Sequence, residues 1–225
     1  MDVFLHDGAL GDLVYSLAVI KQIGGGVIFT RKKVYNIVER LVSRQPYIDD
    51  INDGVPNIPY TNLNGYRIIA RKYPHKHLID CHADLLGISV VKDESWLSNI
   101  PTFSIREIVV SRTMKRHNTS FDWRMLEKYN RNIVFVGFKN EYNAFHKEVG
   151  FDVMFMQCSD GFELASVING AKLFIGNQSF AFSIAEGLKK PRILEVDLSI
   201  PNCTPSGKDG YTAIDDSVIG RYLNG

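Results

Sequence analysis

The chain has 225 residues, of which 45% are hydrophobic, so it can bury a sizeable core as one large α/β domain or as two small ones. Its 26 basic and 25 acidic residues nearly cancel, which excludes a molecule-wide attraction to polyanions and confines any nucleic-acid contact to a local patch. The three widely spaced cysteines form no CxxC pair, which indicates a reduced compartment and no structural zinc site. Because polar residues interrupt the N-terminus and no apolar run has the length of a membrane span, we expect a cytoplasmic protein.

The first part of the chain has the pattern of two strand–helix units. An apolar strand at residues 3–5 is followed by a glycine-containing loop and by a helix that ends at three consecutive glycines. Residues 27–29 then form a second strand, and residues 34–42 a second amphipathic helix. This order predicts a parallel sheet with right-handed crossovers.

The loop after the first strand reads GALGD, residues 8–12. Its two glycines allow a ligand or a substrate to approach the backbone closely at the turn between strand and helix. The full dinucleotide fingerprint GxGxxG is absent, so GxxG by itself is a weak motif. We therefore treat Gly8, Ala9, Leu10 and Gly11 as a candidate substrate-facing loop.

Residues 49–101 are harder to assign. We expect short strands near residues 48–51, 66–70 and 77–81, with prolines in the loops between them. The histidines at 75, 77 and 82 suggest a metal site, but they include no helical i, i+4 pair. A solvated basic edge and an acceptor-facing loop are the alternatives.

The alternating pattern restarts after residue 101. Strands are predicted at 107–110, 133–136 and 151–154, and helices at 121–129, 141–149 and 162–169. A basic loop, SRTMKRH, follows the first of these strands. Two half-size doubly wound units, 1–103 and 104–225, are the preferred partition, and a single continuous sheet is the alternative.

The stretch KLFIGNQSFAFSIAEGLKKPRILE, residues 172–195, reads as strand, tight turn, helix and strand. The first amides of the helix have no intrahelical partner and carry partial positive charge, so an anion fits at the turn. Ser179 can cap the helix or donate its hydroxyl to a phosphate oxygen, and Glu186 can accept from a ribose hydroxyl. An ordinary strand-to-helix turn with Ser179 as N-cap is the alternative.

Two segments, GALGDLVYSLAVIKQIGG and FIGNQSFAFSIAEGLKKPRILEV, resemble the signature segments of the heptosyltransferase-like glycosyltransferases. This resemblance implies an α/β, GT-B-like architecture with two small Rossmann-like domains that face each other across a cleft. Residues 1–103 would hold the acceptor and residues 104–225 the nucleotide sugar. It also implies transfer of a sugar to an acceptor hydroxyl with neither a metal nor another cofactor. A single displacement with a base on the acceptor side would invert the anomeric carbon.

The resemblance assigns roles to particular residues. Asp12 matches the aspartate of the family's G-D pair and is the expected general base, although its place at a helix start predicts a low pKa and a weak base. A helix-start charge without a catalytic role is the alternative for Asp12. The loop at 8–11 would face the acceptor, and Glu186 the ribose.

The remaining roles concern the donor. Backbone groups at Gly137 and Phe138 would face the nucleotide base, although an ordinary loop is equally consistent with this stretch. The diphosphate would be bound by the following residues: Arg112, Lys115, Arg116, Gly176, Asn177, Gln178 and Ser179. A solvated basic loop is the alternative for the three cations.

The chain departs from the family pattern in ways that leave the substrates open. Phe180 and Ser183 stand where the family usually has glycine and histidine, which weakens a prediction of ADP-heptose. The chain is also shorter than typical members, which suggests a different and more open acceptor site. The expected acceptor is a glycan of the lipopolysaccharide type, with a hydroxymethylated DNA base, as in small viral GT-B enzymes that act in an infected cell, as the alternative, and no motif establishes either. A non-catalytic nucleotide-sugar binder and a sugar-nucleotide epimerase or hydrolase are the competing functions. The oligomeric state is open.

Overall fold

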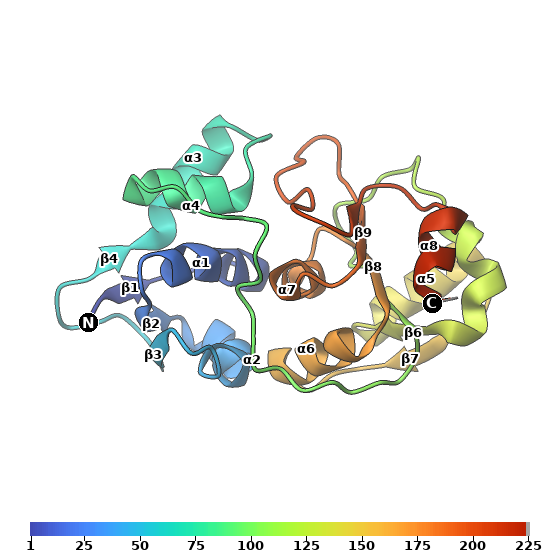
Figure 1. The fold of residues 1–225 in the computed structure, drawn as a ribbon, viewed down its shortest axis with the longest axis horizontal. Helices are drawn as coiled ribbons and strands as arrows, with labels where there is room; N and C mark the ends of the chain where they lie inside the picture. The colour runs from blue at the N-terminus through green and yellow to red at the C-terminus, as the bar shows by residue number, and fades with distance from the viewer. Residues whose placement is uncertain (224–225) are drawn as a thin grey trace.

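Two parallel sheets, each covered by helices, lie side by side in the computed structural model, which describes residues 1–223 (Figure 1). The first sheet has the order β3-β2-β1-β4. Its strands are β1 (Val3–Leu5), β2 (Gly26–Thr30), β3 (Ile48–Asp53) and β4 (Thr61–Asn62). Its helices are α1 (Leu10–Gln22), α2 (Lys32–Val42), η1 (Leu63–Gly65), α3 (Tyr66–Lys72) and α4 (Leu78–Leu86).

The second sheet has the order β10-β9-β8-β5-β6-β7, and every neighbouring pair is parallel. Its strands are β5 (Ile108–Ser111), β6 (Ile133–Val136), β7 (Met154–Met156), β8 (Leu173–Asn177), β9 (Arg192–Glu195) and β10 (Gly210–Tyr211). Its helices are η2 (Trp123–Asn132), α5 (Lys139–Val149), α6 (Gly161–Gly170), α7 (Phe180–Leu188) and α8 (Asp216–Leu223). Numbered along the chain from β5, this is the strand order of the doubly wound dinucleotide-binding fold, whose topological switch point lies between β5 and β8.

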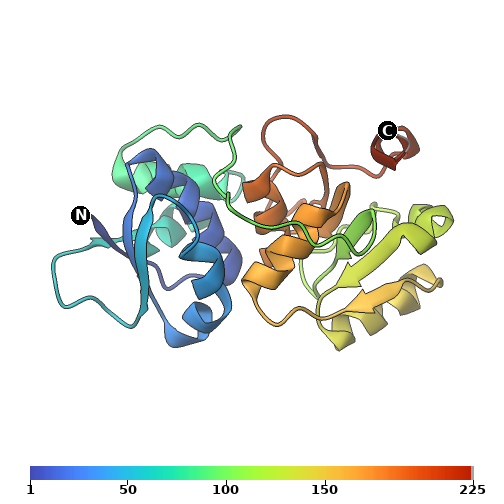
Figure 2. The same cartoon turned by 60° about the horizontal axis from the view of Figure 1, so that its bottom comes forward.

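The two sheets are joined through their helices. Helix α1 packs against α7, and α2 packs against α6 (Figures 1 and 2). The apolar faces of these helices belong to one continuous core, in which Leu13, Leu17, Phe182 and Ile184 are all fully buried. A separate apolar core covers the other face of the second sheet. The space between the two halves is therefore largely filled by packed helices.

The segment between α4 and β5 crosses from one half to the other, and the predicted boundary between 103 and 104 falls within it. Trp96 and Leu97 are buried in this segment, and their backbone amides both donate to the carbonyl of Gly187 at 3.0 Å. A Cβ on Gly187 would approach the Leu97 side chain to 2.9 Å, so this position accepts only glycine without displacement. The crossing segment thus packs directly on α7.

Four expected elements differ in the structure. Residues 66–70, expected as a strand, form most of α3, and the strand expected at 77–81 is the start of α4, where His77 Nδ1 caps the helix by accepting from Ile79 N at 3.1 Å. In both segments, tertiary packing of an amphipathic turn outweighs the strand preference of the apolar residues. The helix expected at 121–129 is the 3-10 segment η2, and the expected strand at 151–154 begins later, at Met154.

Candidate functional site

A cavity of about 490 Å³ lies between the two halves, at the amino ends of α1 and α7. It adjoins the carboxyl ends of β1, β5 and β8, so it contains the switch point of the second sheet. In open parallel sheets, ligands bind in this crevice outside the carboxyl ends of the strands. The predicted residues that line the cavity are Ala9, Gly11, Asp12, Lys115, Arg116, Gln178 and Ser179.

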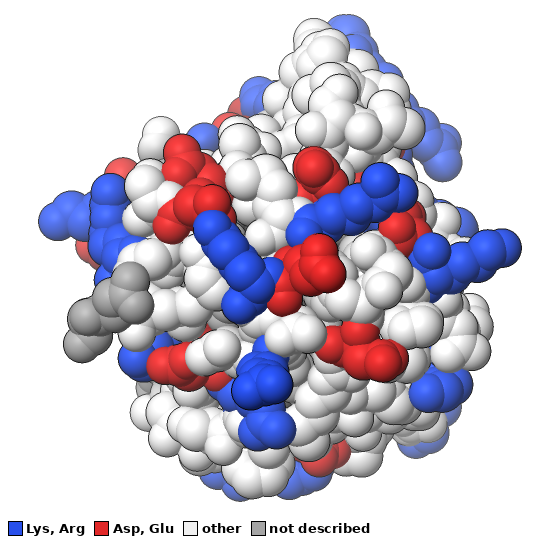
Figure 3. Space-filling model, turned by 90° about the vertical axis from the view of Figure 1, so that its right-hand side faces the viewer, with Lys and Arg blue, Asp and Glu red and all other residues white. Residues whose placement is uncertain are grey.

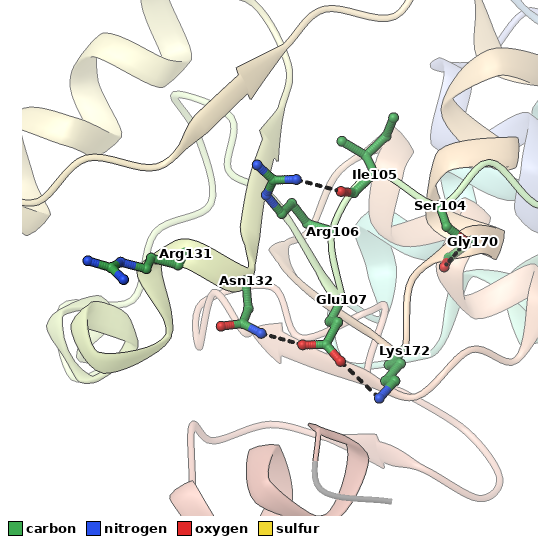
Figure 4. A pocket seen from close by; sticks show the side chains of 8 residues that line it. All are labelled: Ser104, Ile105, Arg106, Glu107, Arg131, Asn132, Gly170 and Lys172. Atoms are coloured by element: carbon green, nitrogen blue, oxygen red, sulfur yellow. Dashed lines mark hydrogen bonds and ion pairs between the residues drawn. The ribbon is translucent and has the colours of Figure 1, made fainter.

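A second cavity of about 410 Å³ lies at the opposite edge of the second sheet, where β5, β6 and β8 begin (Figure 4). Glu107 joins two of its walls by accepting from Asn132 and by pairing with Lys172 at 2.9 Å (Figure 4). Glu107 is the one carboxylate among the residues that line this cavity, and it is already paired with two of the other lining residues. Because it lies at the amino ends of the strands, it is not the ligand crevice of this fold.

The helix starts at the first cavity come close together. A Cβ on Gly11 would lie 3.5 Å from Ser183 Oγ and 3.6 Å from the carbonyl oxygen of Ser179, so α1 and α7 are in contact at their amino ends. Ser179 caps α7, because its hydroxyl accepts from Phe182 N at 3.3 Å. Two partial positive charges thus converge on one cavity, which favours an anionic ligand there.

The loop after β5 adds side-chain charge to the same wall. Lys115 and Arg116 both line the cavity and are exposed. Arg116 has a left-handed backbone, with φ of 63°, and its Nη1 lies 3.2 Å from Asp197 Oδ2. Among residues 1–223, Lys115 has no ion-pair partner within 4.0 Å, so its ammonium group is available to a ligand.

Arg112 lies elsewhere, and its predicted role at the diphosphate requires correction. Its side chain is only 6% exposed and forms a bidentate pair with Glu195, with Nε–Oε2 at 2.7 Å and Nη2–Oε1 at 2.9 Å. A third bond joins Nη1 to Glu148 Oε2 at 2.5 Å. The guanidinium therefore has its donors occupied by two carboxylates and holds β5, β9 and α5 together.

Asn177 and Gln178 are near the cavity but act on the loops around it. Asn177 is fully buried, and its amide accepts from Thr113 N at 3.0 Å and donates to the carbonyls of Thr113 and Lys115. Gln178 donates to Ile200 O at 2.8 Å and accepts from Asp197 N at 2.7 Å. Both side chains therefore hold the two loops that carry Lys115 and Asp197. Their hydrogen bonds indicate this structural role rather than direct binding of a phosphate.

Gly176 is likewise a packing position. A Cβ there would lie 2.6 Å from the carbonyl oxygen of Ser111, because β5 and β8 are neighbours at this point. The residue does not line the cavity. Its side-chain-free backbone therefore serves the close strand contact at the switch point.

Glu186 also requires correction, because it is fully buried in an ion-pair cluster. Its carboxylate pairs with Arg192, which is fully buried as well, and with Lys189 Nζ at 2.5 Å. It also accepts from the Ser206 hydroxyl at 2.9 Å. Burial alone raises the pKa of Glu186, but Arg192 and Lys189 outweigh it and hold the pKa below its usual range. The carboxylate cannot reach a ribose.

The predicted base-binding loop lies at the border of the cavity. Gly137 and Phe138 do not line it, whereas Glu141, at the start of α5, does. Phe138 is 63% exposed, and its backbone amide is occupied by Glu141 Oε2 at 2.9 Å. Contact of this loop with a nucleotide base stays a prediction.

In the substrate-facing loop, Ala9 and Gly11 line the cavity, whereas Gly8 and Leu10 do not. Gly8 is a packing position. Its amide donates to His6 Nδ1 at 3.2 Å, its carbonyl accepts from Arg31 at 3.2 Å, and a Cβ there would lie 2.3 Å from His6 Cε1. Of these four residues, only Ala9 and Gly11 are therefore placed to face a substrate in the cavity.

Asp12 lies at the cavity wall in the first turn of α1. Its carboxylate accepts a hydrogen bond from the Tyr66 hydroxyl, a partner 54 positions away in the sequence. Burial raises the pKa of Asp12 above its ordinary value, against the opposite effects of Tyr66, the Ala9 amide, Arg67 and Arg116. The low pKa expected from the helix start is therefore wrong, because loss of hydration outweighs the helix end, and Asp12 is a stronger base than the sequence indicated.

Several features of the site were not found from the sequence. Tyr15, one turn after Asp12 on α1, lines the cavity together with Thr113, Asn202 and Cys203. The i, i+3 spacing of Asp12 and Tyr15 on one predicted helix was the available signal for Tyr15. The contribution of residues 200–203 depends on Gln178 and had no local signal.

Two of the three histidines singled out in the sequence have structural positions, whereas His75 is exposed. His77 caps α4, and His82 Nε2 lies 3.3 Å from His6 Nε2. Within residues 1–223, no three His, Cys, Asp or Glu side chains are grouped so that they could hold a metal ion. No helix among the described residues combines the length and the apolar character that crossing a membrane requires.

Comparison with known proteins places the fold. Neither a family model nor a curated protein sequence matches the chain. Among solved structures, a family 9 glycosyl transferase from Veillonella parvula is similar with a TM-score of 0.62 at 12% identity, over 99% of this chain and 88% of that chain. The Escherichia coli heptosyltransferase WaaC, solved with ADP-2-deoxy-2-fluoro heptose, is similar with a TM-score of 0.57 at 14% sequence identity. The similarity covers 95% of this chain and 93% of WaaC. The E. coli ADP-heptose lipopolysaccharide heptosyltransferase II is similar with a TM-score of 0.51 at 11% sequence identity, and the similarity covers 100% of this chain and 98% of that chain.

These similarities extend over nearly the whole chain at low identity. The chain therefore has the GT-B-like fold of the heptosyltransferases, and the resemblance read from its two sequence segments is confirmed at the level of the fold. Because one fold hosts many chemistries, the function has to be argued from the site.

Proposed function

We propose that the chain is a glycosyltransferase that moves a sugar from a nucleotide-sugar donor to an acceptor hydroxyl. The observation that carries this proposal is the meeting of a partly buried carboxylate, two cations and two helix amino ends at one cavity between the halves of a GT-B-like fold. The structural neighbours include heptosyltransferases, one of them solved with an ADP-heptose analogue, which supports a nucleotide sugar as donor.

The positive groups suit the departing diphosphate. Lys115, Arg116 and the start of α7 line the same cavity, where they would meet the negative charge that develops on the leaving group. These groups supply the electrostatic stabilisation that a divalent cation supplies in other enzymes. We therefore propose a metal-independent reaction with no further cofactor.

Asp12 suits the acceptor. In the proposed step, the acceptor oxygen bonds to the anomeric carbon while its proton passes to the Asp12 carboxylate. The bond from the anomeric carbon to the diphosphate oxygen breaks at the same time, and its electron pair leaves with the nucleoside diphosphate. A single displacement of this kind inverts the anomeric carbon. The raised pKa of Asp12 favours proton transfer, because a general base works best when its pKa is near the working pH.

We propose a glycan hydroxyl as the acceptor and the cytoplasm as the place of action. On the end of the molecule near α8, basic and acidic side chains are interspersed (Figure 3), as in the Lys128–Asp216 pair at 2.5 Å. This face does not offer the positive stripe that contact with a DNA backbone requires. The cavity itself is bordered by Asp12 and Glu141 as well as by the two cations, which suits a sugar better than a polyanion.

The test is Asp12→Asn, with Asp7→Asn as the matched control, because Asp7 lies in the loop just before α1 and does not line the cavity. A panel of UDP-, ADP-, GDP- and CMP-sugars is first screened for a melting shift, and transfer is then followed by mass spectrometry. Asp12→Asn should lower transfer about a hundredfold or more and leave donor affinity unchanged. Donor binding by the native protein without any transferred sugar would favour a non-catalytic binder, and release of free sugar or of an isomerised donor would favour a hydrolase or an epimerase.

A further inference from the structure

Tyr66 is the first residue of α3, and its side chain reaches from there to Asp12 at the start of α1. Its hydroxyl donates to Asp12 Oδ2, and the residue is only 2% exposed. Burial, and next the charge of Asp12, raise the pKa of Tyr66 above its ordinary value. The phenol therefore remains protonated over the working pH range and remains a donor to the carboxylate.

The ring of Tyr66 is held by two buried histidines. His82 stacks on it with ring centroids 4.2 Å apart and planes 18° apart, and His6 with centroids 5.5 Å apart and planes 11° apart. His6 and His82 are both fully buried. The Arg67 guanidinium lies 5.6 Å from the centroid of the Tyr66 ring. The position of the phenol oxygen is thus set by contacts with β1, α3 and α4.

The hydrogen bonds of the histidines assign their protons. His6 Nδ1 accepts from Gly8 N at 3.2 Å, so Nε2 carries the proton of the neutral ring. His82 Nδ1 donates to Leu78 O at 2.8 Å, so its Nε2 accepts from His6 Nε2 at 3.3 Å. Burial lowers the pKa of His82 to about 4 and, together with His82 and Arg67, lowers the pKa of His6 well below its usual value. The stack is therefore uncharged near neutral pH.

We propose that Tyr66 is the positioning residue of Asp12: its hydroxyl orients the carboxylate toward the cavity and favours the carboxylate's ionised form. This inference rests on the proposed glycosyltransferase function, in which Asp12 receives the acceptor proton. Tyr66 itself does not line the cavity, so it acts through Asp12. The ionisation of Asp12 is then a balance between burial, which disfavours the charge, and the groups that favour it.

The groups that face Asp12 come from several elements. Tyr66 and Arg67 reach it from α3, Arg116 from the loop after β5, and the Ala9 amide from its own helix start, and all four favour the carboxylate. Cys203 lines the same cavity, and the negative charge of Asp12 contributes to the raised pKa of its thiol, which stays neutral. Removal of the Tyr66 hydroxyl deletes one of these favourable contacts and leaves the burial of Asp12 in place.

The experiment compares Tyr66→Phe with Tyr73→Phe. Phenylalanine retains the ring and its stack, and Tyr73 is the matched control because it follows α3 and is 49% exposed. The Asp12 carboxyl is titrated by ¹³C NMR, and transfer is measured across pH. A hydrogen bond to a charged group is worth about tenfold or somewhat more in an equilibrium constant, so Tyr66→Phe should raise the pKa of Asp12 by about one unit.

In the transfer assay, we expect the acidic limb of the pH profile to move upward by the same amount in Tyr66→Phe. On the plateau above this limb, where Asp12 is ionised in both proteins, kcat should fall about tenfold because the carboxylate is no longer oriented toward the cavity, while the KM for donor is unchanged and Tyr73→Phe matches the native protein. A merely structural role would lower the melting temperature without a shift of the limb. An unmoved Asp12 pKa together with an unmoved limb would overturn the proposal.

The two proposals fail in distinguishable ways. If the native protein transfers no sugar from any donor, the glycosyltransferase proposal fails. The NMR titration then still reports whether Tyr66 controls the ionisation of Asp12, because it requires no substrate. If transfer is normal and the titration of Asp12 is the same in Tyr66→Phe, only the positioning role is rejected.

Discussion

Replacement of Arg112 tests whether this residue belongs to the fold or to the ligand. Arg112→Met retains an apolar side chain of similar length and removes the guanidinium. Glu195, which is fully buried, then loses both bonds of its bidentate pair and keeps the hydrogen bond from the Asn118 amide at 2.8 Å. Removal of one member of a buried ion pair costs about 3–5 kcal/mol, because a buried charge is left without its counter-charge.

That cost is a large part of the roughly 5–15 kcal/mol by which a native protein is stable. For a chain of this length, about 1 kcal/mol corresponds to about 2–4 °C, so the melting temperature should fall by roughly 6–20 °C. Urea denaturation followed by circular dichroism measures the free energy of unfolding. Glu148→Gln is the control, because Glu148 is 49% exposed and contributes one bond, and it should cost about 0–1 kcal/mol.

Two further measurements separate stability from binding. In Arg112→Met combined with Glu195→Leu, the buried carboxylate is removed as well, and we expect much of the lost stability to return. Donor affinity of folded Arg112→Met, measured by calorimetry below its melting range, should be close to the native value. If Arg112→Met loses less than about 1 kcal/mol of unfolding free energy but loses donor affinity tenfold or more, this reasoning is refuted and Arg112 belongs to the diphosphate site.

The other predictions concern Arg116 and Glu186. Arg116→Gln should weaken donor binding at least tenfold in calorimetry, because it removes a charged contact worth about 1.5–3 kcal/mol. Arg124→Ala on η2 is the control and should leave donor affinity unchanged. Equal donor affinities in the two variants would assign Arg116 to the solvated surface. The lowered pKa of Glu186 means that its unfolded form binds a proton more readily, so its stabilising effect is present above the unfolded pKa and is lost as pH falls toward the folded pKa. We expect Glu186→Gln to be less stable than the native protein at pH 7, and the two unfolding free energies to converge in acid; a constant difference across pH would contradict the assignment.

The sequence alone was sufficient for the layered architecture. Period-3.6 apolar spacing identified α2, whose Val34, Val38, Leu41 and Val42 are buried, and short apolar runs followed by turns identified β1, β5 and β8. The turns at Gly11 and Ser179 were located because glycine, a capping hydroxyl and a helical pattern are local signals. These turns lie together at the cavity, as expected for the carboxyl ends of parallel strands in a fold of this order.

Only the tertiary structure decided which side chains near those turns are available to a ligand. Arg112, Lys115 and Arg116 look alike in the sequence, yet Arg112 is paired with Glu195, 83 positions away, and the other two face the cavity. Glu186 has the spacing of a ribose ligand but lies beside the buried Arg192.

Asp12 shows the same limit in its chemistry. Its place in the first helical turn is a local feature and predicts a low pKa, whereas its burial and its bond to Tyr66 depend on how α1, α3 and α7 pack. Local patterns report backbone preferences and the direction in which side chains point within one element. Burial and ion pairing are set between elements that are distant in the chain, and these decide whether a charge remains free for chemistry.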